Sequence, residues 1–326
     1  MSFKTPSNRP GPPPLPRSRS GPPPLTVARP KVTWDPKLLA HSQNLEWLSN
    51  LVMAGYNQGL HRSPYHGFSS EFSEFRPYTQ GDDLRFLDWQ VYGRHNRPFI
   101  RRFEAETNLN ALIVVDVSRS MDYHSNPDFP TKYQYAALLA SALIRLFNSQ
   151  NDAAGLALIQ DEAVASYSSP ANTAAKFKHC LALMENAQVT GGGEIAQPLP
   201  GLARRLKGRG QIILISDFLH ELEGLENALK YIGAQRNEIS LLQVLDPEET
   251  EFRSARQGVY EDMETGFRLT VNPEWLKARY LERVRAHQQE LEEICKSHRG
   301  HFHLISTQEA PFGILGELTA RRQRKP

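Results

Sequence analysis

One short stretch of the sequence combines the residue types of a metal site. The apolar run Leu112 to Val115 ends directly on Asp116, and Ser118 and Ser120 follow in the pattern Asp-x-Ser-x-Ser. The apolar run is typical of a buried strand, and the turn after it can bring three oxygen-bearing side chains to face one point. Because carboxylates and hydroxyls are ligands of hard cations, the pattern predicts a Mg²⁺ site with water completing an octahedron.

A second predicted strand ends in the same way. Ser216 and Asp217 directly follow the apolar run at 211–215. In a parallel sheet the carboxyl ends of the strands share one edge, and ligands bind at that edge. We therefore expect Asp116 and Asp217 to come from neighbouring strands. Asp116 is expected on a surface loop, binding the metal directly or through water, and Asp217 is expected to hold a metal-bound water.

Two other interpretations of the motif stay open. Asp116 and Ser118 could cap the turn that leads out of the strand by hydrogen bonding to its backbone. Asp116 could instead be the nucleophile of a Mg²⁺-dependent phosphohydrolase, which needs a second carboxylate nearby and a lysine to neutralise phosphate. The motif has serines where that carboxylate would stand, and the glycine run at 191–193 lacks the lysine of a phosphate-binding loop. The sequence therefore favours a protein that is not an enzyme.

From residue 109 onward the chain alternates apolar strands with amphipathic helices. Strands are predicted at 111–115, 153–159, 211–215, 239–245 and 301–305, and helices at about 131–149, 172–186, 195–206, 222–232, 273–297 and 311–320. A polar hairpin is expected around 264–266. Continuous apolar strands alternating with helices predict an α/β fold, a doubly wound and mostly parallel sheet of the Rossmann type.

The chain before this alternation divides into two predicted parts. Residues 1–33 contain ten prolines and six basic residues but no acid, so we expect a disordered, proline-rich basic arm. Residues 34–107 are expected to form an N-terminal helix and a small strand-rich extension, and residues 108–326 the α/β domain. In the helix, Asp35 caps the first turn, and Gly55 and Gly59 end the last one.

Composition excludes several classes of protein. The chain has 326 residues and a net charge of +2, so the part after the +6 arm carries −4 and offers no basic surface for a nucleic acid. Two cysteines, Cys180 and Cys295, fall on apolar helix positions, where they are expected as buried small side chains. The absence of a long apolar run or a secretory leader predicts no membrane span and a cytoplasmic location.

The two motifs together resemble a known kind of site. Asp-x-Ser-x-Ser after one strand and Ser-Asp after another are similar to the metal-ion-dependent adhesion site of von Willebrand factor A domains. The segment upstream closely resembles the domain-of-unknown-function 58 family of bacterial and archaeal proteins, and the likeness covers roughly residues 60–310. The matching residues are Arg76, Tyr78, Gly81, Asp82, Asp83, Asp88, Trp89, Arg94, Glu104 and Glu106.

This resemblance implies a non-enzymatic protein-interaction module. Members of the family look like adaptors or co-chaperones of MoxR-type AAA+ ATPases, and a carboxylate from the partner would fill an open position on the metal. The upstream block has two interpretations: a structural charge network under aromatic cover, or a surface that docks the partner. The candidate docking residues are Arg76, Asp82, Asp83, Asp88, Trp89 and Arg94.

The sequence departs from the adhesion-site pattern at one position. The resemblance implies a threonine ligand at 193, where this chain has glycine. Thr190 lies three residues before that position and Glu194 one residue after it. Either Glu194 or a water fills the vacant ligand position, or the metal binds weakly, or the site binds no metal.

Overall fold

The computed structural model describes most of the chain from Trp34 onward. The described residues are 34–42, 44–60, 75–79, 92–93, 97–101, 109–192, 195–206, 208–220, 222–252, 258–261, 268–271 and 273–323. The predicted arm at 1–33 and most of 61–108 lie outside these ranges. The predicted domain boundaries therefore stay predictions.

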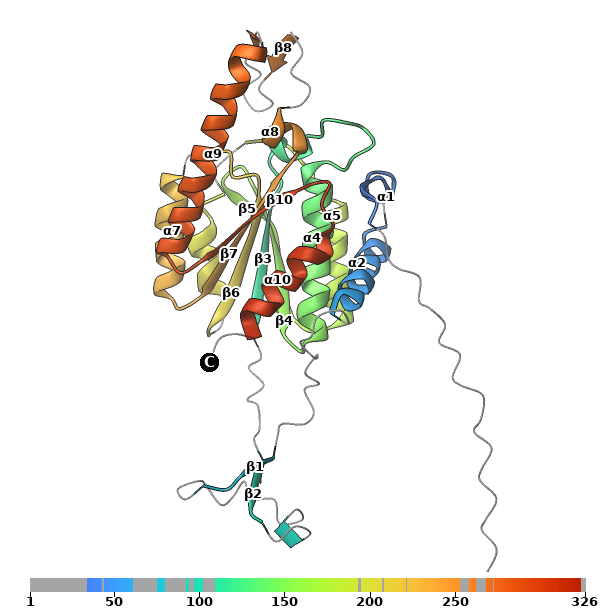
Figure 1. Ribbon diagram of the computed structural model, residues 1–326, viewed down its shortest axis with the longest axis vertical. Coiled ribbons are helices and arrows are strands. Elements are labelled where there is room, and N and C mark those ends of the chain that lie inside the picture. The colour runs from blue at the N-terminus through green and yellow to red at the C-terminus, as the bar shows by residue number, and fades with distance from the viewer. Residues whose placement is uncertain are drawn as a thin grey trace, which may run out of the picture. The chain divides into compact units, whose positions relative to one another are not determined.

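The main sheet has six strands in the order β10-β7-β6-β3-β4-β5 (Figure 1). The strands are β3 (Asn110–Asp116), β4 (Ala153–Gln160), β5 (Ala163–Ala171), β6 (Gly210–Ser216), β7 (Glu238–Leu245) and β10 (His301–Ser306). All neighbours are parallel except β4 and β5. β3 and β6 are adjacent, with Val115 opposite Ile215, which confirms that the two motif-bearing strands are neighbours.

Helices cover both faces of this sheet (Figure 1). One face is covered by α4 (Lys132–Ser149) and α5 (Ala174–Glu185), and α2 (Leu45–Leu60) and α10 (Pro311–Gln323) pack around α4. The other face is covered by α6 (Leu199–Arg205), α7 (Glu223–Ala234) and α9 (Pro273–Ser297). Successive strand residues point to opposite faces, so Ile113 and Leu112 join separate buried clusters. The predicted doubly wound, mostly parallel α/β fold is confirmed.

Helix α4 begins at a well-defined residue. The hydroxyl of Thr131 accepts a hydrogen bond from the backbone N–H of Gln134, and the Gln134 side chain accepts one from the N–H of Thr131. This reciprocal capping box fixes the start of the helix. Lys132 is therefore held as the first helical residue, within hydrogen-bonding distance of Asp217, which follows β6.

The predicted single N-terminal helix is two helices, α1 (Pro36–His41) and α2. The chain leaves the helical conformation at Ser42, whose backbone is extended. It starts again when the side chain of Asn44 accepts a hydrogen bond from the N–H of Trp47. The prediction failed because the apolar positions keep helical spacing across this break, whereas the local serine and asparagine favour caps.

The two glycines that were expected to end this helix lie inside α2, which continues to Leu60. A Cβ added at Gly55 would lie 2.8 Å from Phe312 of α10. Glycine at this position therefore permits close approach of the two helices and does not stop the first one.

The sequence analysis missed the edge strand β5, whose short polar residues and Pro170 hide its pattern. It also missed the five-residue helix α8 (Pro247–Glu251) after β7. Short antiparallel pairs join β1 (Phe75–Pro77) to β2 (Phe99–Arg101) and β8 (Gly258–Glu261) to β9 (Arg268–Val271), in agreement with the predicted extension and hairpin.

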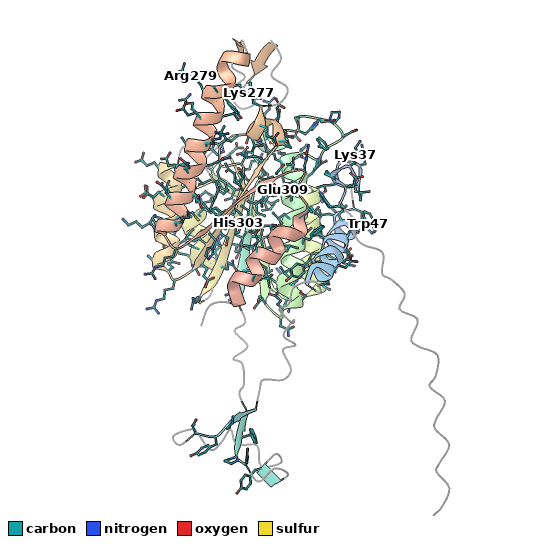
Figure 2. All side chains as sticks on the ribbon, in the orientation of Figure 1. Lys37, Trp47, Lys277, Arg279, His303 and Glu309 are labelled. Carbon is teal, nitrogen blue, oxygen red and sulfur yellow. The ribbon has the colours of Figure 1, made fainter. Side chains whose placement is uncertain are left out.

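Two further expectations can be compared with the described residues. Cys180 and Cys295 are free and buried, as predicted. None of the described helices combines the length and the apolar character that a membrane crossing requires. At the outer edge of the sheet, His303 of β10 (labelled in Figure 2) lies 3.1 Å from the Glu317 carboxylate of α10.

We expect Gly155→Ala to destabilise the protein by about 1–3 kcal/mol, the usual cost of overpacking. Gly155 lies at an irregularity in the pairing of β4 with β5, and a Cβ there would lie 2.5 Å from the carbonyl oxygen of Ser168 and 2.6 Å from the nitrogen of Pro170. Backbone atoms cannot move aside as a flexible side chain can. Urea unfolding followed by circular dichroism would measure the change.

Gly201→Ala is the matched control, since a Cβ at this helical position meets nothing within 4 Å. It should leave stability unchanged or raise it by up to ~1 kcal/mol through helix propensity. Equal stabilities of the two variants would contradict the close approach of β5 to Gly155.

Candidate functional site

Asp116, the last residue of the central strand β3, accepts hydrogen bonds at both carboxylate oxygens. Oδ2 accepts from the hydroxyl of Ser216 at 2.6 Å, and Oδ1 accepts from the N–H of Ser118 at 2.8 Å. The first bond joins the ends of β3 and β6 directly. Because a carboxylate can accept about four such contacts, each oxygen keeps the capacity for a further ligand.

The two serines of the motif connect this carboxylate to the second one. The hydroxyl oxygens of Ser118 and Ser120 lie 3.1 Å apart, and the Ser120 hydroxyl hydrogen bonds to Asp217. The structure therefore brings together all four residues that the sequence proposed as metal ligands. Their role as ligands stays a prediction.

The two carboxylates have opposite electrostatic surroundings. Burial raises the pKa of Asp116, and the negative charge of Asp217 raises it further. Burial would also raise the pKa of Asp217, but the charge and hydrogen bond of Lys132, with the Ser120 hydroxyl, hold that pKa below its usual value. Asp217 is thus the more firmly ionised of the pair.

Lys132 forms two buried ion pairs at the site. Its Nζ atom donates to Oδ2 of Asp217 and to Oε1 of Glu249, each at 2.7 Å. The lysine and Asp217 side chains are 1% and 0% exposed, and that of Glu249 is 16% exposed. Burial would lower the pKa of Lys132, but the two carboxylates raise it above its usual value, so the ammonium stays charged.

Glu249 is positioned by the helix α8. Asp246 caps this helix by accepting from the N–H of Glu248, while Oε2 of Glu249 accepts from the N–H of Asp246. At the other end, Nζ of Lys277 (labelled in Figure 2) donates to the carbonyl of Phe252 at 2.9 Å, which ties α8 to α9. Lys132 therefore pairs with a carboxylate on a short helix that is fixed at both of its ends.

Asp116 was expected on a surface loop, and this expectation was wrong. It is the last residue of β3 and only 3% exposed. The strand continues one residue beyond the apolar run because β4 pairs with it as far as Asp116, which lies opposite Ile159, whereas the pairing with β6 ends at Val115. Its replacement would therefore remove a buried hydrogen-bond acceptor as well as a predicted metal ligand.

The glycine-run residues are only partly described. Thr190 is exposed, and its hydroxyl and carbonyl oxygens accept hydrogen bonds from the side chain of Gln160 at 2.6 and 3.1 Å. The carbonyl of the next residue, Gly191, accepts from the N–H of Arg119, which ties this loop to the motif. Gly193 and Glu194 lie outside the described residues, so their predicted roles stay open.

The candidate docking block is also largely outside the described residues. Asp82, Asp83, Asp88, Trp89 and Arg94 are not described, and Arg76 is described only as a backbone position of β1, paired with Ile100. Neither interpretation of this block, the charge network or the docking surface, is decided by the structure.

Sequence reasoning missed Lys132 and Glu249, although weak signals for both were present. A lysine at the start of an otherwise apolar helix is unfavourable to the helix dipole, which indicates a compensating acid. Asp-Pro-Glu-Glu at 246–249 is the signature of a capped helix. Neither signal predicts that the side chains of Lys132 and Glu249 form an ion pair, because the two residues are 117 positions apart in the sequence.

The strand order and the site define a doubly wound α/β protein with clustered acids and hydroxyls at the carboxyl edge of its sheet. The family model described as "Protein of unknown function DUF58" matches residues 74–290, which is more than half of the chain. The chain belongs to this family, which confirms the resemblance found in its sequence.

Relatives and solved structures with similarity to the chain are known. The uncharacterized proteins Rv1480 of Mycobacterium tuberculosis and Mb1516 of Mycobacterium bovis are each 33% identical over 236 residues, covering 71% of this chain and 73% of the relative. BatB of Bacteroides thetaiotaomicron (TM-score 0.46, 16% identity) covers 67% of this chain and 100% of its own. The SpRpn10 VWA domain (TM-score 0.40, 12% identity) covers 65% and 95%.

We expect Lys132→Met to destabilise the protein by about 3–5 kcal/mol at neutral pH with EDTA present, because it leaves buried carboxylates without their cation. The pKa of Asp217, lowered in the wild type, should rise in the variant, so the folded variant binds more protons than the wild type as pH falls. The stability difference should therefore shrink as pH falls. Urea unfolding between pH 5 and 8 would measure it.

Lys178→Met, at an exposed position of α5, is the control and should change stability by less than about 0.5 kcal/mol. A Lys132→Met variant as stable as this control would show that the buried ion pairs contribute nothing to the fold.

Proposed function

We propose that the protein is a non-enzymatic interaction module that binds a carboxylate of a protein partner through Mg²⁺ at Asp116, Ser118, Ser120 and Asp217. The proposal is supported above all by one observation: adjacent strands β3 and β6 deliver these oxygen atoms to one point and are joined there by the bond from Ser216 to Asp116. An all-oxygen set of carboxylates and hydroxyls suits a hard cation that keeps water or an exchangeable ligand.

The charge balance at this point also favours a cation. Asp217 and Glu249 pair with the one ammonium of Lys132, and the carboxylate of Asp116 lies beside that of Asp217. The pKa of Asp116 is raised by burial and by its negative neighbour, and a bound cation would relieve both effects. Mg²⁺ would thus complete an arrangement that the lysine neutralises only in part.

The surroundings of the site suit an approaching acidic segment. Arg119 is exposed between the two motif serines, and Ser120 is only half-buried. Val117, which follows Asp116, lines a cleft of about 390 Å³ together with Gln160 and His179. A partner carboxylate on the metal would lie beside an arginine, with its neighbouring residues directed toward this cleft.

The family resemblance points to the class of partner. Members of the family look like adaptors of MoxR-type AAA+ ATPases, so the partner we propose is an ATPase subunit of that class that presents an aspartate or glutamate. The interaction would then depend on a divalent cation.

We expect Asp116→Asn to reduce Mg²⁺-dependent binding of the MoxR-type ATPase from the same organism by roughly tenfold or more, in line with losses seen when metal sites are altered. The amide keeps an acceptor for the N–H of Ser118, so the fold should persist. Affinity pull-down and biolayer interferometry with Mg²⁺ or EDTA would measure binding, with circular dichroism to check folding.

Asp122→Asn, at an exposed carboxylate of the same loop, is the matched control and should bind the ATPase like the wild type. Undiminished binding by Asp116→Asn, or binding that is the same in Mg²⁺ and EDTA, would refute a metal-mediated contact and turn attention to the block at 71–106.

The phosphohydrolase alternative is tested separately because the structure contains two features that the sequence analysis did not find. Asp217 supplies a second carboxylate near Asp116, and Lys132 supplies a lysine. However, Nζ of Lys132 already donates to two carboxylates, and the lysine side chain is only 1% exposed, so it is not free to neutralise a bound phosphate. These features favour binding over turnover.

We therefore expect no hydrolysis of p-nitrophenyl phosphate or acetyl phosphate above the rate of the Asp116→Asn variant, with Mg²⁺ or Mn²⁺ present. Colorimetric assays of released nitrophenol and phosphate would detect it. Turnover that is lost on replacing Asp116 would establish the enzyme and overturn the adaptor proposal.

A further inference from the structure

A histidine ring at the candidate site has a buried nitrogen without a described partner. Ligand atoms of Asp116, Asp217 and His220 all lie within 4.8 Å of one another. The Nε2 atom of His220 is buried, and no described residue hydrogen bonds to it. Leaving a buried polar atom without a hydrogen bond costs about 1–3 kcal/mol. The unpaired Nε2 atom of His220 therefore points to a ligand that would bind it.

The conformation of the loop after β6 brings the side chain of His220 close to that of Asp217. Phe218, between them, adopts a left-handed conformation with φ of 52°, which is rare for a bulky residue. Its N–H donates to the Ser216 hydroxyl at 3.0 Å, and its carbonyl oxygen lies 2.6 Å from Nε2 of His287 in α9. These contacts hold a strained turn, and the turn determines where the imidazole lies.

The distances suit shared ligation. With bonds of about 2.1 Å, two ligands of one ion lie no more than roughly 4.2 Å apart, so a small side-chain adjustment would close the observed cluster around an ion. Carboxylates alone would suit Mg²⁺, but a neutral imidazole nitrogen is a borderline ligand that Mg²⁺ rarely accepts and that Mn²⁺, Co²⁺ and Zn²⁺ accept readily.

We propose that His220 is a ligand of this site and that the site takes a first-row divalent transition metal in preference to Mg²⁺. The inference rests on the proposed function, because it names the metal class of the same site. It adds a nitrogen donor from the β6–α7 loop to the oxygen donors of the two strand ends.

The affinity test uses the full chain and the metals alone. Titration calorimetry with Mn²⁺, Zn²⁺ and Mg²⁺ should show tighter binding of the first two ions. Any oxygen site shows some of this preference. The ratio of transition-metal affinity to Mg²⁺ affinity in a His220 variant therefore decides whether the histidine is a ligand. In His220→Gln, Mn²⁺ and Zn²⁺ affinity should fall about tenfold or more while Mg²⁺ affinity hardly changes, so that the preference collapses.

A spectroscopic test on the wild-type chain does not depend on how a variant folds. Electron spin-echo envelope modulation of bound Mn²⁺ should show the nitrogen couplings of a coordinated imidazole. These couplings should vanish in His220→Gln and persist in His124→Gln, a control at an exposed histidine in the loop after Ser120.

The outcomes separate this inference from the proposed function. Wild-type Mn²⁺ without imidazole couplings, an unchanged affinity ratio in His220→Gln, or no cation binding at all would each overturn the histidine ligand. If Asp116→Asn still abolishes Mg²⁺-dependent ATPase binding while His220→Gln has no effect on any ion, the adaptor site stands without the histidine.

Discussion

The ammonium of Lys132, enclosed between Asp217 and Glu249, is the interaction on which the rest of the site depends. It joins the first turn of α4, the end of β6 and the short helix α8. These three segments are far apart in the sequence. Desolvating these charges is costly, and their attraction offsets that cost only while all partners stay in place. The arrangement therefore fixes the carboxyl edge of the sheet in one geometry.

The same lysine contributes to the difference in pKa between the two neighbouring carboxylates, Asp116 and Asp217. It holds the pKa of Asp217 low, so this group stays ionised, whereas burial and the negative charge of Asp217 raise the pKa of Asp116. Environments that push the pKa values of adjacent acids apart are common at functional sites. Asp116 lies where the strands β3 and β6 end, and the cation that we propose would bind there without displacing the ammonium of Lys132.

A doubly wound sheet supports many unrelated functions, so the fold alone does not decide this one. The decision rests on side chains: hydroxyls from the β3 turn, carboxylates from two strands and an imidazole from the loop after β6. Lys132, the lysine that contacts these groups among the described residues, is already paired with two carboxylates. This combination supports the proposed binding of a cation and a partner carboxylate over the transfer of a phosphoryl group.

The sequence by itself determined the alternation of strands and helices, the adjacency of the two motif strands and the four oxygen-bearing residues that meet at their ends, because apolar periodicity and strand-end residues are local signals. It could not show that α1 and α2 are separate, since the break depends on caps within an unbroken apolar pattern. It could not find β5, whose serines carry no strand pattern until β4 pairs with them. Only the tertiary structure buried Asp116, brought Lys132 to Asp217 and Glu249, and turned His220 toward the acids. Each of these depends on contacts between distant segments or on a strained turn at Phe218, which local residue preferences oppose.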